Sequence, residues 1–273
     1  MSWTLALILA GYGAAVGAYG TLIGAGGGFL IVPALLLSGL ATAEQAAGTS
    51  LVAVFANSAS GSLSYARQRR IDVRTALYLS ASAVPGSLGG AYLTKLLAGR
   101  AFDAAFGILM LLIAGWLFVK PQPAPRTSDA THARGRGWID RRFTDAHGVE
   151  HAYSFFLPGA MVASAVIGVL SSTLGIGGGV ILVPVLISLL RFPPHVATAT
   201  SQLVLAVSAL IGASSHYLLG HVLLGPAVML AMGAVVGAQI GAKLSAKLKG
   251  KLVVRLLSLA LVIVGGRLVL RAL

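Results

Sequence analysis

The stretch GAGGGFLIVPALLL, residues 24–37, returns 151 positions later as GIGGGVILVPVLIS, residues 175–188. In both copies a cluster of glycines interrupts an apolar run, and a proline stands five residues after the last glycine. The same offset superimposes residues further along the chain, namely Thr49-Ser50 on Thr200-Ser201, Gly61 on Gly212, Gly86 on Gly237, Gly90 on Gly241, Gly99 on Gly250 and Gly115 on Gly266. One structural unit therefore occurs twice in the chain.

The composition is that of a polytopic membrane protein. Hydrophobic residues make up 57% of the 273 residues, and charged residues only 10%, whereas soluble domains average about 25% charged residues. The net charge of +13 comes from basic residues clustered between apolar runs, where they orient helices in a bilayer, so nucleic acid is not an expected partner. The chain has no cysteine, and we expect no metal site and no cofactor.

Each half contains five apolar segments: residues 3–23, 29–40, 44–66, 75–95 and 102–119, then 153–174, 180–190, 196–219, 223–243 and 252–270. Most reach the roughly 20 residues that a membrane-spanning helix needs. The second segment of each half would extend only about 18 Å, which predicts a half-helix. The expected fold is an all-α polytopic membrane protein with two homologous repeats, residues 1–119 and 153–273, and 8–10 spans.

Residues 120–152 are the only long polar stretch and are expected to form a cytoplasmic linker between the repeats. The stretch KPQPAPRTSDATHARGRG is rich in Pro, Gly and Arg, which predicts a flexible segment. The following WIDRRFTDAHGVEHAYSF predicts a hairpin that turns at residues 145–148.

The distribution of basic residues favours an inverted relation between the repeats. The loop with Arg67, Arg69, Arg70 and Arg74 is matched by LLGHVLLG, which has no Lys or Arg. Five plus five inverted spans place 16 of the 20 basic residues on the cytoplasmic side, whereas four plus four parallel spans place only 12 there. We therefore expect inversion, with both chain ends outside.

The glycine clusters predict helices broken at mid-membrane. Such breaks occur only where they are buried in protein or line a polar cavity, and glycine lets backbone approach a ligand closely. Each half-helix would point its electropositive start at the break, with the proline in or near its first turn, and inversion would bring both starts together as an anion site. The alternative is that the glycines only allow close helix packing, which we expect for Gly86, Gly90, Gly237 and Gly241.

Other polar groups could complete this site. The candidate substrate-binding residues are Gly24, Gly26, Gly27, Gly28, Pro33, Thr49, Ser50, Asn57, Gly175, Gly177, Gly178, Gly179, Pro184, Thr200, Ser201 and Gln202. The hydroxyls would donate to an oxyanion, although a hydroxyl in a membrane helix often bonds to its own helix instead. His216 lies within a predicted span and could relay protons or be an ordinary hydrogen-bonded histidine.

Acidic residues are scarce. Outside the linker only Glu44, Asp72 and Asp103 occur, all near predicted membrane ends. A cation pathway uses carboxylates, so anion passage fits better. We find no catalytic constellation and expect no enzyme.

The paired motifs GAGGGFLIVP and GIGGGVILVP, each followed by a Thr-Ser pair (AAGTSL and TATSQL), resemble the TauE/SafE sulfite exporter family. The resemblance covers nearly the whole chain apart from the linker. It implies a permease of the bacterial inner membrane that handles sulfur oxyanions or small organic anions, with the glycines, prolines and Thr-Ser pairs at the site. Gly48 precedes the first pair and Ala199 the second, so the two halves of the site are not identical.

We therefore expect a secondary transporter that exports a small oxyanion such as sulfite or an organosulfonate, with the lipid bilayer and a small anion as partners. The alternatives are a proton-coupled importer of a small organic anion, with His216 as relay, and a non-transporting scaffold that acts through its linker. The identity of the anion, the coupling ion and a homo-oligomeric state are left open.

Overall fold

The computed structural model describes residues 2–97, 99–119, 136–146, 148–245, 247–248 and 250–272. The helices of the first half are α1 (Trp3–Ile23), α2 (Gly28–Leu37), α3 (Ala43–Arg67), α4 (Val73–Leu93) with a 3₁₀ turn at Thr94–Leu96, and α5 (Arg100–Val119). Those of the second half are α6 (Leu157–Leu174), α7 (Gly179–Pro184) continued by a π turn at Val185–Leu189, α8 (Pro194–Leu218), α9 (Leu224–Ser245) and α10 (Gly250–Ala272). Strands β1 (Trp138–Thr144) and β2 (Glu150–Phe156) lie between the halves. The expectation of a helical protein is confirmed.

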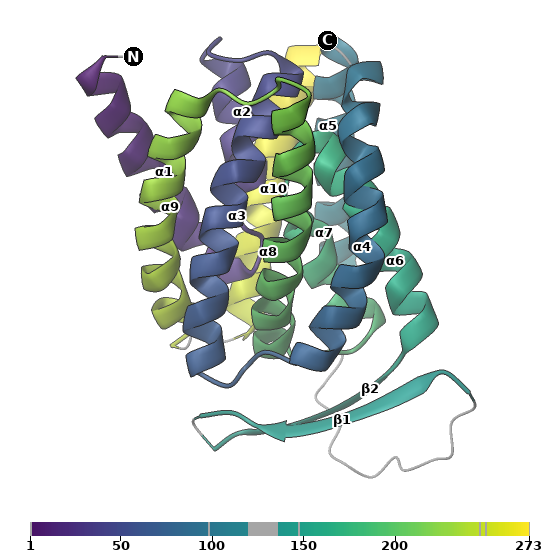
Figure 1. The fold of residues 1–273 in the computed structure, drawn as a ribbon. Helices are drawn as coiled ribbons and strands as arrows, with labels where there is room; N and C mark the ends of the chain where they lie inside the picture. The colour runs from purple at the N-terminus through teal and green to yellow at the C-terminus, as the bar shows by residue number, and fades with distance from the viewer. Residues whose placement is uncertain are drawn as a thin grey trace.

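The end of the linker forms the predicted antiparallel hairpin, in which Trp138 pairs with Phe156 and Thr144 with Glu150. The hairpin lies across one end of the helix bundle (Figure 1), which we call the hairpin end. The prediction of an apolar helical segment from residue 153 was wrong by four residues, because Tyr153 and Phe155 belong to β2 and α6 begins at Leu157. Alternate burial along β2 explains the difference, since both aromatic rings pack against Phe192.

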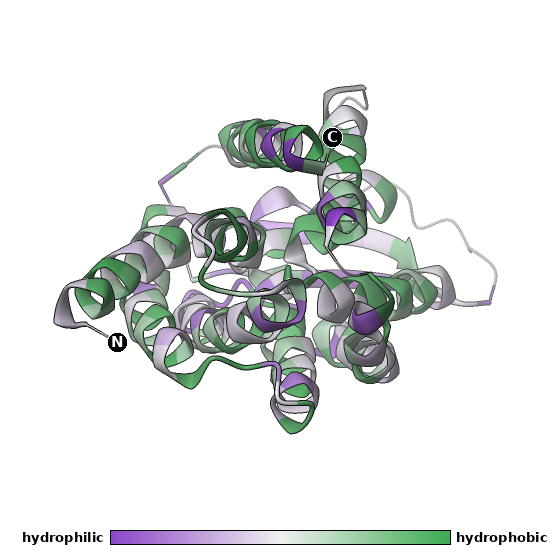
Figure 2. Ribbon diagram, turned by 90° about the horizontal axis from the view of Figure 1, so that it is seen from above, coloured by the Kyte–Doolittle hydropathy of each residue, from purple (hydrophilic) through white to green (hydrophobic). Residues whose placement is uncertain are grey.

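Five described helices, α1, α5, α6, α8 and α9, are long and apolar enough to cross a membrane. Helix α3 has 25 residues but a more polar sequence, which it tolerates because most of its length is buried between other helices. Hydrophobic residues predominate along the helices (Figure 2), and many of them are exposed, including Trp3, Leu7 and Leu218, which are all more than 70% exposed. An exposed apolar surface of this extent is stable in lipid and not in water.

The first helix of each half packs against a helix of the other half. Helix α1 packs on α9, and its counterpart α6 packs on α4, while α3 and α8 form the centre and α5 pairs with α10 at one side (Figure 1). Glycines let these helices approach closely: a Cβ on Gly86 would meet the carbonyl of Ala165, and one on Gly237 would meet the carbonyl of Ala14. Ala165 stands 151 residues after Ala14, so both contacts are the same contact made twice. They support the packing interpretation of these glycines.

The central helices α3 and α8 run in opposite directions. The Thr49 hydroxyl, near the start of α3, accepts a hydrogen bond of 3.0 Å from the N–H of Leu223, beyond the end of α8. The Thr200 hydroxyl, near the start of α8, accepts one of 3.1 Å from the N–H of Asp72, beyond the end of α3. Accordingly, α1 begins at the end of the bundle away from the hairpin, whereas α6 begins beside the hairpin (Figure 1).

Candidate functional site

Two glycine-rich breaks lie at the centre of the bundle. After α1, Gly24, Gly26 and Gly27 have φ between 75° and 86°, and after α6 the equivalent Gly175, Gly177 and Gly178 have φ between 69° and 77°. This left-handed region is accessible to glycine and strained for other residues. The backbone therefore turns sharply before α2 and α7, and glycine is required at these positions for conformational reasons alone.

The prolines lie further along than expected. Pro33 is the sixth residue of α2 and Pro184 the sixth of α7, so the expectation of a place in or near the first turn was wrong. Each ring removes a donor from the second turn, where the i→i−4 bond would form. In the second half the helix changes to π geometry directly after Pro184.

The two breaks are in direct contact. The Ser50 hydroxyl donates a hydrogen bond of 2.9 Å to the carbonyl of Gly175, and the Ser201 hydroxyl donates one of 2.9 Å to the carbonyl of Gly24. Each serine therefore reaches the break of the opposite half. A Cβ on Gly28 would lie 2.6 Å from the carbonyl oxygen of Gly175, and one on Gly179 would lie 2.5 Å from that of Gly24. Only glycine permits this approach of the starts of α2 and α7.

A path of buried polar groups, which we call the polar path, runs from the first break toward the hairpin end. The Asn57 amide donates to the carbonyl of Gly26 at 3.2 Å and its oxygen accepts from the Thr21 hydroxyl at 3.1 Å. The Tyr65 hydroxyl then donates to the carbonyl of Thr21 at 2.8 Å. The Gln202 amide lies 3.5 Å from the carbonyl of Gly20 on the same side. The path thus combines α1, α3 and α8.

Two polar atoms beside this path have no hydrogen-bond partner among the described residues: the Ser58 hydroxyl and the amide oxygen of Gln202. Both side chains are fully buried, and the Ser58 hydroxyl lies 3.3 Å from the position of a Cβ on Gly26. Unpaired buried polar groups are rare in stable folds. The Ser58 hydroxyl is therefore an unpaired polar group beside the first break.

The second half has a less polar counterpart of this path. Ala209 and Leu51 occupy the positions equivalent to Ser58 and Gln202. His216 stands at the position equivalent to Tyr65. Its Nε2 lies 3.0 Å from the carbonyl oxygen of Ser172, which corresponds to the contact between the Tyr65 hydroxyl and the carbonyl oxygen of Thr21. This contact is of the ordinary hydrogen-bonded kind, although Nδ1 also lies 3.3 Å from Nδ1 of His221.

The structure thus brings together most of the candidate residues from the sequence, including all eight glycines, both serines, Asn57 and Gln202. The threonines are different, because Thr49 and Thr200 bond to loops between helices and not to the breaks. Sequence reasoning missed Thr21, Ser58 and Tyr65. The signal for Thr21 was its place one turn before the first glycine cluster, and that for Tyr65 was its alignment with His216.

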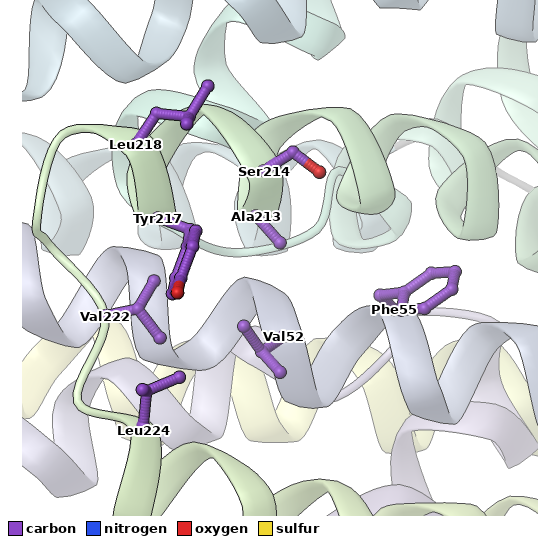
Figure 3. A pocket seen from close by; sticks show the side chains of 8 residues that line it. All are labelled: Val52, Phe55, Ala213, Ser214, Tyr217, Leu218, Val222 and Leu224. Atoms are coloured by element: carbon purple, nitrogen blue, oxygen red, sulfur yellow. The ribbon is translucent and has the colours of Figure 1, made fainter.

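In this conformation apolar side chains fill the crossing of the breaks. Leu205 lies 2.7 Å from the position of a Cβ on Gly26, and Val54 lies 2.5 Å from that of a Cβ on Gly177. A cavity of about 320 Å³ lies elsewhere, in an apolar groove between α3 and α8 (Figure 3). Figure 3 shows side chains such as Val52, Tyr217 and Leu224 along this groove.

The hairpin is fastened to the bundle through Asp72, the residue that caps α4. Its carboxylate, which is fully buried, accepts hydrogen bonds from Arg141 Nε at 2.8 Å and from the Tyr153 hydroxyl at 2.7 Å. Burial by itself would raise the pKa of the Asp72 carboxyl, but the hydrogen bonds that it accepts outweigh burial and hold the pKa below its usual value. Burial, followed by the neighbouring carboxylate, raises the pKa of Tyr153. The group is therefore a charged carboxylate held by a neutral phenol and a guanidinium.

In the part of the chain that the structure describes, no group of three or more His, Asp or Glu side chains is arranged to hold a metal ion.

Comparisons with known proteins agree on one family. The family model described as Sulfite exporter TauE/SafE matches residues 9–268. The probable membrane transporter protein YunE of Bacillus subtilis is 32% identical over 98% of both chains. A probable membrane transporter protein of Xylella fastidiosa is 30% identical over 75% of this chain and 71% of its own length, and one of Methanocaldococcus jannaschii is 26% identical over 83% and 80%. No solved structure matches the chain.

The family model covers almost the whole chain, including both glycine breaks and both central helices. The apolar helices and the names of the relatives identify a multi-pass membrane transporter. The chain therefore belongs to the sulfite exporter TauE/SafE family.

Proposed function

We propose that this transporter exports a small oxyanion, such as sulfite or an organosulfonate, through a site between two inverted repeats near the middle of the bacterial inner membrane. The observation that carries this proposal is the reciprocal contact of the two glycine breaks through Ser50 and Ser201. A pair of half-helix starts that meet at one point supplies unpaired N–H groups and positive dipole ends, which together favour an anion.

Hydrogen bonds repeated at the same offset support the inverted relation. Ser201, Thr200 and Leu223 follow Ser50, Thr49 and Asp72 by 151 residues, and each makes the bond of its counterpart in the opposite half. Such an exchange requires a two-fold relation between the halves. Because α3 and α8 run in opposite directions, the axis of this relation lies across the helices, in the plane of the membrane.

The positions of basic residues support a cytoplasmic hairpin end. The loop after α3 contacts the hairpin, since the carbonyl of Gln68 accepts a hydrogen bond from the N–H of Ala146. Gln68 also bonds through its amide to the carbonyl of Ala242, near the end of α9. The basic residues of the α3–α4 loop, the hairpin and the α9–α10 connection thus share one end of the bundle, which the positive-inside rule assigns to the cytoplasm.

The charge of the path supports an anion. Among the described residues the buried carboxylates are those of Asp72, Asp103 and Asp145, and all three lie at helix ends or in the hairpin. A cation on the polar path would therefore meet no counter-charge, whereas an anion would meet hydroxyl, amide and backbone donors. An inside-negative potential favours export of a negative charge by about 2.3 kcal/mol per 100 mV, so export needs no coupling ion.

Transport by the purified protein in liposomes tests this proposal. We expect counterflow of sulfite or of a sulfonate such as taurine or sulfoacetate, with weaker counterflow of sulfate, thiosulfate and lactate. Ser58→Ala should reduce the flux, because it removes a buried donor, and it should fold normally, because Ala209 occupies the equivalent place in the second half. Ser82→Ala is the matched control, since that hydroxyl is exposed and bonds within its own helix.

The absence of flux for every anion of the panel, with correctly inserted protein, would overturn the export proposal. A proton-coupled importer is the second candidate, and the His216–His221 contact at the end away from the hairpin is the observation that favours it. A pH jump separates the two. Flux that follows an imposed proton gradient, and that His216→Gln uncouples from it, would favour the importer.

A further inference from the structure

Arg70 is a buried basic side chain beneath the hairpin. It lies in the loop between α3 and α4 and is only 5% exposed. Its Nε and Nη1 atoms have no hydrogen-bond partner among the described residues. A guanidinium that is removed from water and left without hydrogen bonds is unfavourable, so these two donors face a place that a ligand would improve.

The negative group next to Arg70 belongs to the hairpin. Asp145 Oδ2 at the hairpin turn lies 3.8 Å from Arg70 Nε, which is an ion pair but too long for a hydrogen bond. The Asp145 carboxylate itself accepts from the N–H of Val149 at 3.0 Å and lies 3.2 Å from His151 Nε2. Both of these partners are also in the hairpin. If the hairpin moves as one body, Asp145 keeps these two partners, and Arg70 loses the negative charge beside it.

A second unpaired side chain lies near Arg70 and Asp145. His195, the second residue of α8, interacts electrostatically with Arg70 and with Asp145, and its Nδ1 is buried without a hydrogen-bond partner among the described residues. No side chain caps the start of α8, and the N–H groups of His195 and Val196 come too early in this helix of 25 residues to have an acceptor within it. A guanidinium, an imidazole nitrogen and a helix start together form the donor set of an oxyanion site.

We propose that Arg70, His195 and the start of α8 form a binding site for a small oxyanion at the hairpin end of the polar path, and that Asp145 occupies this site as a tethered plug until the solute displaces it. The proposal rests on the proposed function for the role of this site as the entry to the path. Arg70 lies one turn beyond Tyr65 at the end of α3, where its backbone N–H donates to the backbone carbonyl of Tyr65.

The Asp72 contacts hold the plug in place. Arg141 of β1 and Tyr153 of β2 both donate hydrogen bonds to the Asp72 carboxylate. The backbone N–H of Asp72 donates to the hydroxyl of Thr200, the neighbour of Ser201. Asp72 therefore links the hairpin to the start of α8.

The plug belongs to one end of the transporter only. His221 and Leu223 occupy the positions equivalent to Arg70 and Asp72, so at the opposite end these two positions carry neither a guanidinium nor a carboxylate. Oxyanions are therefore recruited at the hairpin end, where export begins.

Equilibrium binding to the purified full-length protein tests the site without any transport. The probes are sulfite and inorganic phosphate, titrated at constant ionic strength and followed by tryptophan fluorescence or calorimetry. Asp145→Asn retains an oxygen for the N–H of Val149 and should bind the probe about tenfold tighter than the unchanged protein, because the competing charge is gone. Arg70→Gln should abolish this binding, and Arg142→Gln, an exposed arginine of the same hairpin, should leave it unchanged. Equal affinity of the unchanged protein and Asp145→Asn, or tight binding by Arg70→Gln, would overturn the proposal.

A reversible lock tests the movement of the hairpin. The chain has no cysteine, so the pair Gln68→Cys and Ala146→Cys, whose backbones are hydrogen-bonded, can join the hairpin to the bundle by one disulfide. The oxidised pair should stop flux and reduction should restore it. The control pair Thr144→Cys and Glu150→Cys joins the two strands to each other and should transport normally in both states.

The outcomes separate the two proposals. Normal flux through the oxidised Gln68–Ala146 lock contradicts the plug and leaves export standing. No flux in the unchanged protein contradicts export, and the binding titration then still decides whether Asp145 and the solute compete for Arg70.

Discussion

Replacing Gly28 by alanine tests the contact between the breaks. Gly28 is helical and does not have a positive φ, so alanine is not strained by its backbone conformation. Its Cβ would lie 2.6 Å from the carbonyl oxygen of Gly175, 2.8 Å from a methyl of Val54 and 2.9 Å from the carbonyl carbon of Ile176. Two of these three atoms are backbone, so the clash is relieved only if the two breaks move apart.

The size of the effect follows from this geometry. Adding a methyl group to a filled core costs about 1–3 kcal/mol, and alanine in place of glycine returns at most about 1 kcal/mol of helix propensity. A net loss of about 1–2 kcal/mol lowers the unfolding midpoint by about 2–8 °C at this chain length. Gly89→Ala is the control, because no atom lies within 4 Å of its Cβ position, and it should raise the midpoint by about 1–4 °C.

Thermal unfolding in detergent, followed by tryptophan fluorescence, measures both shifts, and counterflow in liposomes measures transport. Gly179→Ala repeats the experiment in the second half, where the Cβ would lie 2.5 Å from the carbonyl oxygen of Gly24. We expect Gly28→Ala and Gly179→Ala to lose similar amounts of stability and most of their flux. Two variants as stable and active as Gly89→Ala would refute the argument that the half-helix starts meet.

Two further predictions concern the hydrogen bonds around the site. Ser50→Ala and Ser201→Ala should each lower the free energy of unfolding by about 1–3 kcal/mol, because a buried glycine carbonyl loses its donor. Chemical denaturation measures this loss. Losses that differ between the two variants by several kcal/mol would contradict the symmetry of the two contacts. The lowered pKa of Asp72 means that its charged form stabilises the fastened hairpin above about pH 4. That stabilisation is lost as the pH falls through the lower folded value. A spin label at Thr144→Cys should therefore become mobile only in acid, whereas in Asp72→Asn it should be mobile at neutral pH too. A label of unchanged mobility in that variant would show that Asp72 does not hold the hairpin.

Much of the fold could be predicted because it depends on local or periodic properties. Runs of about 20 apolar residues give membrane-spanning helices, and nine of the ten helical segments begin and end within a few residues of the expected positions. The exception is residues 153–156, whose apolar side chains are compatible with either a helix or a strand. Its strand conformation follows from pairing with residues 138–141, which hydropathy does not reveal.

The candidate site was predictable in part. The glycines could be found because each copy of the motif validates the other, and Ser50 and Ser201 because they follow at the same spacing. The separation of serine from threonine within each pair could not be found, since adjacent residues on a helix point in directions about 100° apart. Which of the two faces the break depends on how α3 and α8 are rotated against each other.

By itself the sequence determined a duplicated membrane protein with a glycine break in each half, because hydropathy, repeat length and backbone conformation are properties of short segments. Tertiary structure alone decided that each serine bonds to the break of the other half, and that Arg141 and Tyr153 close on Asp72 across 69 and 81 residues. The reason is that contacts between distant residues depend on the packing of whole helices, and no local pattern records it.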